Sequence, residues 1–364
     1  MNYKETLFFV GKCLTITHEE HNRVIVENKI KYGIVDWDNV VKLSTKHYVF
    51  PALYCNLKRA DFLHYLPTDL VEYMKHITDL NRERNLQIIE QAKEINELLV
   101  ANNMTPVFLK GTGNLLRGLY DDIAERMVGD IDFIVDKNTA DKTIKVLSEN
   151  QYTYLNKTPK QLGYIKHYSR MIKKGSINAI EVHLEMTRER HSALFNYKYV
   201  QSSIITKKGI TYLSLKQHLL HTIINKQLND YGYQYKNIAL RNYYDVFLLS
   251  FKTNTLDSIL SLPSINKQLN SFLSNASYIF NMPSTILYDK NNHVFKYTTS
   301  TMNLLKRTWF TKFRTSFIHF KIVALVRMSI LIKALYQRKY FLFVIDKLTD
   351  INWCKRRLGI KSTP

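Results

Sequence analysis

The stretch Asp130-Ile-Asp-Phe-Ile-Val135 is an apolar segment that opens with two carboxylates. Its β-branched and aromatic residues predict a buried strand. Side chains two residues apart on a strand point to the same side, so Asp130 and Asp132 should lie a few ångströms apart. Two like charges that close repel each other, and burying them is costly unless a cation lies between them. The pair therefore predicts a divalent-metal site. Oxygen ligands favour Mg²⁺, and two such ions suit in-line phosphoryl transfer.

A second candidate feature lies upstream, in the turn Lys110-Gly-Thr-Gly113. It follows a short apolar segment, 105–109, which predicts a strand, and precedes 114–120, which predicts the start of a helix. Glycines allow a backbone to approach a phosphate closely, and the helix start offers free N–H groups. Lys110 could contact phosphate oxygens, and we expect Gly111 and Thr112 to form part of a nucleotide-binding turn.

The third feature is a later strand, Ile180-Glu-Val-His-Leu-Glu185, whose polar side chains alternate with apolar ones. Alternation places Glu181, His183 and Glu185 on one face, available for chemistry. A third carboxylate there would hold the catalytic metal and help deprotonate an acceptor hydroxyl. Glu181 is the preferred candidate, with Glu185 left open. His183 could orient a phosphate or assist proton transfer, or it could simply be a hydrogen-bonded strand residue.

Composition predicts that the rest of the chain is rich in helix. Only 18 of 364 residues are Gly or Pro, and few turn formers favour long helices over many strands. The expected fold class is α+β, with a small mixed sheet embedded in a helix-rich chain. We predict four parts: an N-terminal helical region over 1–104, a mixed core over 105–190, a helical domain over 191–300, and a basic, aromatic helical segment over 301–364.

The charge is uneven and indicates a polyanionic partner. The chain carries a formal +21, and residues 301–364 hold 14 Lys and Arg against two Asp. Such a segment could bind RNA or an anionic membrane surface. Its aromatic residues could stack on bases, but their helical spacing favours core packing. The longest stretch free of charged residues is polar throughout, so we expect no transmembrane segment.

The three cysteines, Cys13, Cys55 and Cys354, are isolated in the sequence. They form no metal-binding or redox pair, which fits a reducing compartment. The expected location is therefore the cytoplasm, with peripheral contact at the inner membrane surface as a further possibility.

Three motifs together resemble a bacterial nucleotidyltransferase family of the DNA polymerase beta-like superfamily. They are Val107-Phe-Leu-Lys-Gly111, Arg126-Met-Val-Gly-Asp-Ile-Asp-Phe-Ile-Val135 and Ile180-Glu-Val-His183, which are similar to the family pattern LKG, R-x-x-x-D-[IV]-D-x-x-V and [DE]-x-H. Weaker similarity extends over about 30–250. The resemblance implies that Asp130, Asp132 and Glu181 are metal ligands and that Arg126 and Lys110 contact phosphate. It says nothing about the acceptor.

The function expected from these features is Mg²⁺-dependent transfer of a nucleoside monophosphate from an NTP, with release of pyrophosphate. The acceptor could be an RNA end such as tRNA, a protein side chain or a small sugar-like molecule. One alternative is a non-catalytic module that binds RNA or an anionic membrane through the basic segment. Another is an interaction protein whose acids are merely solvated.

Overall fold

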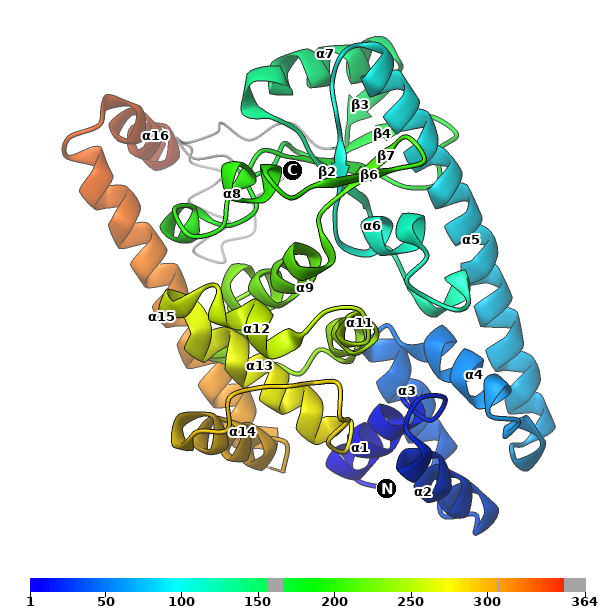
Figure 1. Cartoon of the computed structure of the whole chain (residues 1–364). Helices are drawn as coiled ribbons and strands as arrows, with labels where there is room; N and C mark the ends of the chain where they lie inside the picture. Colours follow the sequence, from blue (N-terminus) through cyan, green and yellow to red (C-terminus); the bar gives the residue numbers. More distant parts are fainter. Residues whose placement is uncertain (156–165, 307, 350–364) are drawn as a thin grey trace, which may run out of the picture. The chain divides into compact units, whose positions relative to one another are not determined.

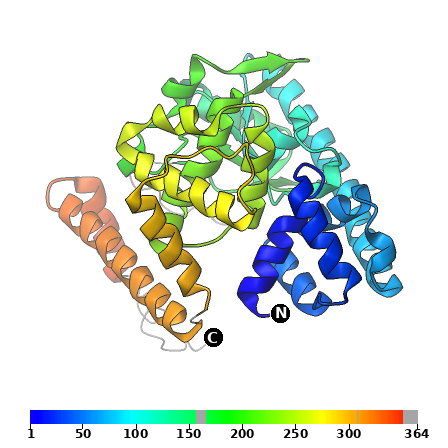
Figure 2. The ribbon, with the colours of Figure 1, turned by 60° about the horizontal axis from the view of Figure 1, so that its bottom comes forward.

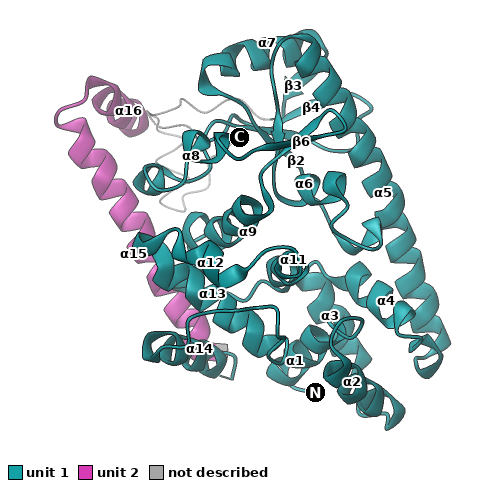
Figure 3. Ribbon diagram, viewed as in Figure 1, with its two compact units in different colours: residues 1–155, 166–307 teal, residues 156–165, 308–364 magenta. Residues whose placement is uncertain are grey.

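The computed structural model describes residues 1–155, 166–306 and 308–349. Contacts within the chain divide it into two compact units, shown in different colours in Figure 3. Unit 1 comprises Met1–Leu155 and Lys166–Arg307, and the described part of unit 2 is 308–349. The sheet, the helices around it and the candidate site all belong to unit 1.

The centre of unit 1 is a seven-stranded mixed sheet of order β3-β4-β5-β2-β1-β7-β6. The strands pair β2 with β5 and β1 with β7 in parallel, and all other neighbours antiparallel. Together with the many helices, this sheet confirms the α+β fold class. The bounds are β1 (Val107–Phe108), β2 (Ile131–Ile134), β3 (Tyr152–Tyr154), β4 (Met171–Lys173), β5 (Ile180–His183), β6 (Ile205–Lys207) and β7 (Ile210–Tyr212).

The hairpin β6–β7 lies in a part of the chain expected to be helical. Lys208 and Gly209 form its two-residue turn, with φ of 53° and 76°, as a tight hairpin turn of this kind requires. β7 then pairs with β1, so the sheet extends past the predicted core boundary at 190. The sequence signal for this hairpin is a Gly between two β-branched runs.

The expected turn at Lys110 is instead the first turn of a helix, α6 (Lys110–Arg117). The chain passes from β1 to α6 through the single extended residue Leu109. Gly113 makes this close passage possible, because a Cβ there would lie 2.7 Å from the carbonyl oxygen of Phe108. The free N–H groups of the helix start therefore begin at Lys110, earlier than predicted.

The helices before the sheet form the predicted N-terminal helical region. Figures 1 and 2 show α1 to α4 gathered at one end of α5, which runs on past the sheet. The long helix α5 starts directly after Pro67 and ends at Ala101. The bounds are α1 (Tyr3–Cys13), α2 (Glu20–Lys31), α3 (Trp37–Lys46), α4 (Phe50–Arg59), η1 (Leu63–Tyr65) and α5 (Thr68–Ala101).

Helices also cover the sheet and continue after it. In Figure 1 α7 lies above the strands and α6 and α9 lie below them. The helix α9 passes without a break into a π-helix, η5. The remaining elements of unit 1 are η2 (Ile123–Glu125), η3 (Lys137–Thr139), α7 (Ala140–Glu149), η4 (Glu189–His191), α8 (Tyr197–Gln201), α9 (Leu215–Ile224), η5 (Asn225–Asn229), α10 (Gly232–Tyr235), α11 (Leu240–Ser250), α12 (Thr255–Leu260), η6 (Pro263–Ile265), α13 (Asn266–Ile279) and α14 (Asn292–Leu304).

The described part of unit 2 consists of two helices, α15 (Thr308–Ala334) and α16 (Arg338–Thr349), which pack against each other. The expectation that the aromatic residues of this segment form a core is wrong for α15. Trp309 is 77% exposed and Phe320 is 70% exposed. The end of the predicted basic segment, which includes Lys355, Arg356 and Arg357, lies outside the described residues.

The helix α15 also bears on the expectation that the chain has no transmembrane segment. Residues Trp309–Ala334 are long and apolar enough to cross a membrane by length and composition, with a mean hydropathy of 1.6 and none of that window buried. A stretch without charged residues does not include this helix, because five basic residues interrupt it: Lys312, Arg314, Lys321, Arg327 and Lys333. A helix can be apolar on average and still contain isolated charged residues.

Candidate active site

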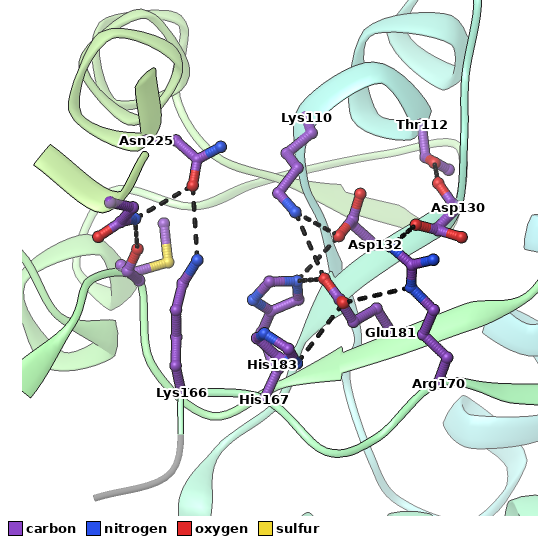
Figure 4. Close-up of polar contacts among 12 residues, drawn as sticks. Lys110, Thr112, Asp130, Asp132, Lys166, His167, Arg170, Glu181, His183 and Asn225 are labelled. Atoms are coloured by element: carbon purple, nitrogen blue, oxygen red, sulfur yellow. Dashed lines mark hydrogen bonds and ion pairs between the residues drawn. The ribbon is translucent and has the colours of Figure 1, made fainter. Parts of the chain in front are cut away.

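The parallel pairing of β2 with β5 places Asp132 directly beside Glu181. His183 follows on β5, and its Nε2 lies 2.9 Å from Asp132 Oδ1 and 3.0 Å from Glu181 Oε2 (Figure 4). All three side chains are buried. The polar faces predicted for the two strands therefore meet at one point in the sheet.

These three residues form a group that could hold a metal ion. One ligand atom from each lies within 4.8 Å of the other two. Two buried carboxylates side by side repel each other, so the arrangement is unfavourable unless positive charge compensates them. A carboxylate pair suits a hard cation such as Mg²⁺, whereas an added imidazole nitrogen is more typical of transition metals. The donor set therefore fits a divalent cation.

Lys110 supplies positive charge to the same carboxylates. Its Nζ lies 2.6 Å from Asp132 Oδ1 and 3.5 Å from Glu181 Oε2. Burial alone would lower the pKa of Lys110, but the two carboxylates outweigh it and raise that pKa. Burial would likewise raise the pKa of Asp132, yet Lys110 and His183 hold it below its ordinary value. The acids are therefore ionised and ready to bind a cation.

Asp130 lies apart from this group of three. Its carboxylate pairs with Arg170 of the segment before β4, at 2.9 Å, and Arg170 also lies 3.7 Å from Glu181. Burial raises the pKa of Asp130, with Asp132 adding to the rise and Arg170 opposing it. The two aspartates of the predicted pair therefore have different partners, although one arginine links Asp130 to the same site.

The structure shows contacts of Gly111 and Thr112, the two residues predicted to form part of a nucleotide-binding turn. Gly111 packs against Arg126, since a Cβ at Gly111 would lie 3.5 Å from the Arg126 Cζ. The hydroxyl of Thr112 donates to the carbonyl oxygen of Asp130, at 3.2 Å. That bond fixes the start of α6 to the start of β2. A phosphate contact from Thr112 stays a prediction.

Arg126 is buried and does not reach the carboxylates of the site. Its Nε donates to Asp245 on α11, at 3.1 Å, and its Nη1 donates to the Met127 carbonyl oxygen. Asp245 also accepts a hydrogen bond of 2.7 Å from the hydroxyl of Tyr120. Because the guanidinium is held in this way, it fixes the position of the segment that leads into β2. The predicted phosphate contact of Arg126 is untested, and this geometry does not favour it.

The loop 120–127 is held by further polar contacts that the sequence did not reveal. Asn81 and Asn85 of α5 donate to the carbonyl oxygen of Arg126. Glu125 accepts from Arg59 of α4 and from the hydroxyl of Tyr244 of α11. The helical region before the sheet thus fixes the entry into β2, which carries the site's aspartates.

The positions of Glu181 and Glu185 distinguish the two candidates for the third carboxylate. Glu185 is buried and forms an ion pair with Lys137, whereas Glu181 lies beside Asp132. β5 ends at His183, so the strand alternation predicted to carry Glu185 onto the same face stops before that residue. Glu181 is the carboxylate that the structure brings to the site.

Lys166 borders the site and was not foreseen from the sequence. Its Nζ donates to Asn225 Oδ1 of the π-helix η5, at 3.4 Å. In Figure 4 Lys166 and the carboxylates Asp132 and Glu181 lie on opposite sides of Lys110. Among the described residues, no carboxylate lies within ion-pair distance of Lys166. Burial, with Lys110 adding to it, lowers the pKa of Lys166 to about 8. A lysine without a carboxylate partner near a carboxylate site is suited to an anionic ligand.

One cavity of the described chain lies away from this site. It has a volume of about 840 Å³ and lies among α1, α13 and α14, where Lys4, Tyr278 and Phe295 contribute to its walls. None of the carboxylates of the site borders it. The cavity therefore adds nothing to the chemistry at β2 and β5.

Comparison with known proteins agrees with the motifs. No curated protein and no solved structure matches the chain. The model of one family, described as an uncharacterised nucleotidyltransferase, matches residues 34–277. This match covers α3 to α13 and includes β2, β5 and the site between them. Because it spans more than half of the 364 residues, the chain belongs to this nucleotidyltransferase family.

Proposed function

We propose that the protein transfers a nucleoside monophosphate from an NTP to a hydroxyl or phosphate acceptor, with Mg²⁺ held by the carboxylates at β2 and β5. The observation that carries the proposal is the buried group of Asp132, Glu181 and His183, at the centre of a chain that belongs to a nucleotidyltransferase family. Asp130, linked to Glu181 through Arg170, completes the set of acids. Fold kinship with the DNA polymerase beta-like superfamily is part of the same proposal.

Each residue has a role that follows from its position. Asp132 and Glu181 would hold the ion, with Asp130 as the further carboxylate that a second ion needs. Mg²⁺ bound there would neutralise charge on the phosphates and on the departing pyrophosphate. His183 has its Nε2 between the two carboxylates, so it keeps them in place as a hydrogen-bond donor.

The triphosphate would lie against the two lysines. Lys110 and Lys166 approach the site from α6 and from the segment before β4, and the charge of Lys110 helps to lower the pKa of Lys166. A triphosphate between them would supply the negative charge that Lys166 lacks. The acceptor oxygen then attacks the α-phosphorus, the bond to the bridging oxygen breaks, and Glu181 takes the acceptor's proton.

The test is incubation of the purified protein with Mg²⁺ and each α-labelled NTP in turn, with and without total tRNA. The control is the double variant Asp130→Asn/Asp132→Asn. Label on RNA, on the protein itself or on a small molecule, present only with the intact acids, identifies the acceptor class. The proposal fails if label transfer is the same in the double variant.

The non-catalytic alternative predicts a different result. A binding module would gain thermal stability neither from Mg²⁺ with an NTP nor from the NTP alone. The proposed enzyme would gain stability from Mg²⁺ with the NTP, because ligand binding to the native state raises the melting temperature. That gain should disappear in Asp132→Asn.

A further inference from the structure

The apolar surface of α15 is unusual for a helix in water. A helix of a soluble protein buries one apolar stripe and exposes a polar face. Along α15 most of the exposed residues are apolar, and all of these except Val326 lie within about half of the helix circumference. The exposed apolar residues are Trp309, Phe310, Phe313, Phe317, Phe320, Leu325, Val326, Met328, Leu331 and Ile332. An apolar helix that is not buried within the chain needs another apolar environment.

The second helix of unit 2 continues this surface. α16 packs on α15, and Lys333 Nζ lies 5.2 Å from the ring centroid of Tyr340. Its own exposed residues are again apolar, among them Phe341, Leu342 and Ile345. The pairing of the two helices therefore leaves apolar side chains on the outside of the pair.

The length of α15 suits a bilayer. It has 27 residues, which at 1.5 Å per residue gives about 40 Å, against about 30 Å for the hydrocarbon core of a membrane. Its window of high hydropathy has none of its residues buried, which separates it from the core helix of a soluble domain. It also lies after the catalytic core, away from the region where signal sequences occur.

The charge of the same unit indicates which kind of bilayer it would meet. Residues 308–349 contain eight Lys and Arg but only one acid, Asp346. Basic residues next to apolar ones are attracted to anionic headgroups. Lys321 and Arg327, in the middle of α15, have long stems that can extend to the headgroups. A protein partner would need many acids to match these charges, whereas an anionic membrane surface already provides them.

We infer that α15, together with α16, inserts its apolar side chains into an anionic lipid bilayer and so attaches the enzyme to a membrane. The inference concerns unit 2 alone and holds whether or not the proposed nucleotidyl transfer is correct. It places the reaction of unit 1 next to a membrane surface.

The test is flotation of the full chain on a sucrose gradient after cell-free synthesis with vesicles. Vesicles of phosphatidylcholine with about a third phosphatidylglycerol are compared with vesicles of phosphatidylcholine alone. Most of the protein should float with the anionic vesicles, and several-fold less with the neutral ones. Aggregated protein sinks and so is not counted as bound.

The decisive variant is Phe313→Asp/Phe317→Asp/Phe320→Asp, which should reduce flotation by about tenfold or more because charged side chains oppose insertion. The control is Leu80→Asp/Leu86→Asp, which also replaces exposed apolar side chains by aspartate, at two positions of α5, and should float like the parent chain. Tryptophan fluorescence gives a second readout, since brominated lipids should quench the parent more strongly than the Trp309→Phe variant, which keeps Trp37 and Trp353.

Three results would overturn the inference. The first is parent protein that stays at the bottom of the gradient while remaining soluble. The second is equal flotation of the parent and the triple variant. The third is a stable oligomer by light scattering, without vesicle binding, that the triple variant abolishes, because a second copy of the chain would then cover α15.

Discussion

The two units of this protein use apolar residues in opposite ways. In unit 1 the apolar residues of the strands are inside, and the buried Asp132 beside them is paired with Lys110 and His183. In unit 2 aromatic and aliphatic residues are outside, and basic residues lie among them. The difference shows that the two units are built for different surroundings. Unit 1 holds its charged groups beside a buried sheet, and unit 2 exposes apolar side chains to its surroundings.

The largest effect expected in unit 1 is loss of catalysis in Asp132→Asn. The change removes a carboxylate that would hold the metal, so kcat/KM should fall on the order of 10³-fold. The measurement is the rate of NMP transfer once the acceptor is known. Vesicle flotation should be unchanged, because α15 is not altered.

The matched control is Asp136→Asn, the same substitution just after β2. Asp136 accepts the backbone N–H of Asn138 at the start of η3, and asparagine can accept that bond as well. This variant should keep its activity. Activity that survives in Asp132→Asn, or is lost equally in both variants, would contradict the assignment of Asp132 to the metal.

The next largest effect should come from Asp245→Asn, which removes the carboxylate opposite Arg126. Breaking one partner of a buried ion pair leaves a charge without compensation, so the free energy of unfolding should fall by about 3 kcal/mol. Tyr120→Phe removes one hydrogen bond to the same carboxylate and should cost about 1 kcal/mol. Denaturant unfolding of the two variants measures both.

A surface pair provides the comparison for Asp245. Asp79 is 45% exposed and pairs with Lys75, so Asp79→Asn should change the unfolding free energy by less than about 1 kcal/mol. Equal losses in Asp79→Asn and Asp245→Asn would show that Arg126 is not stabilised by its buried partner. In that case Arg126 would be released for the phosphate contact that the resemblance implies.

Much of unit 1 could be predicted because its strands carry clear patterns. The apolar run after Asp130 and the alternation from Ile180 indicate β2 and β5, and Pro67 marks the start of α5. The pairing of Asp132 with Glu181 could not be predicted, because it depends on the register between two strands nearly fifty residues apart. The local sequence pattern predicts on which face of a strand a side chain lies. Which side chain of the next strand lies beside it depends on the tertiary fold.

The unpredicted features share a physical reason. Arg126 was assigned to phosphate by resemblance, but Asp245, more than a hundred residues later, holds it in the structure. Lys166 belongs to no motif, and its position next to Asn225 arises from the π-helix η5. In unit 2 the aromatic spacing of α15 is that of a core helix, and only the fold shows that nothing within the described chain buries it. The composition of a segment shows that it is hydrophobic but does not show which part of the structure, if any, buries it.

The smallest effect, and the most specific one, concerns Lys166. Its pKa of about 8 means that it is mostly charged at pH 7 and mostly neutral at pH 9. An NTP binds the charged form better, so the KM for the NTP should rise about tenfold between these two values. Lys166→Arg keeps its charge and should remove the rise, whereas Lys166→Met should have a high KM at both. Equal slopes in the parent and in Lys166→Arg would show that the triphosphate does not contact Lys166. Vesicle flotation should be the same for these three proteins. Residue 166 belongs to the charged site of unit 1, whereas the proposed membrane contact is made by the apolar surface of unit 2.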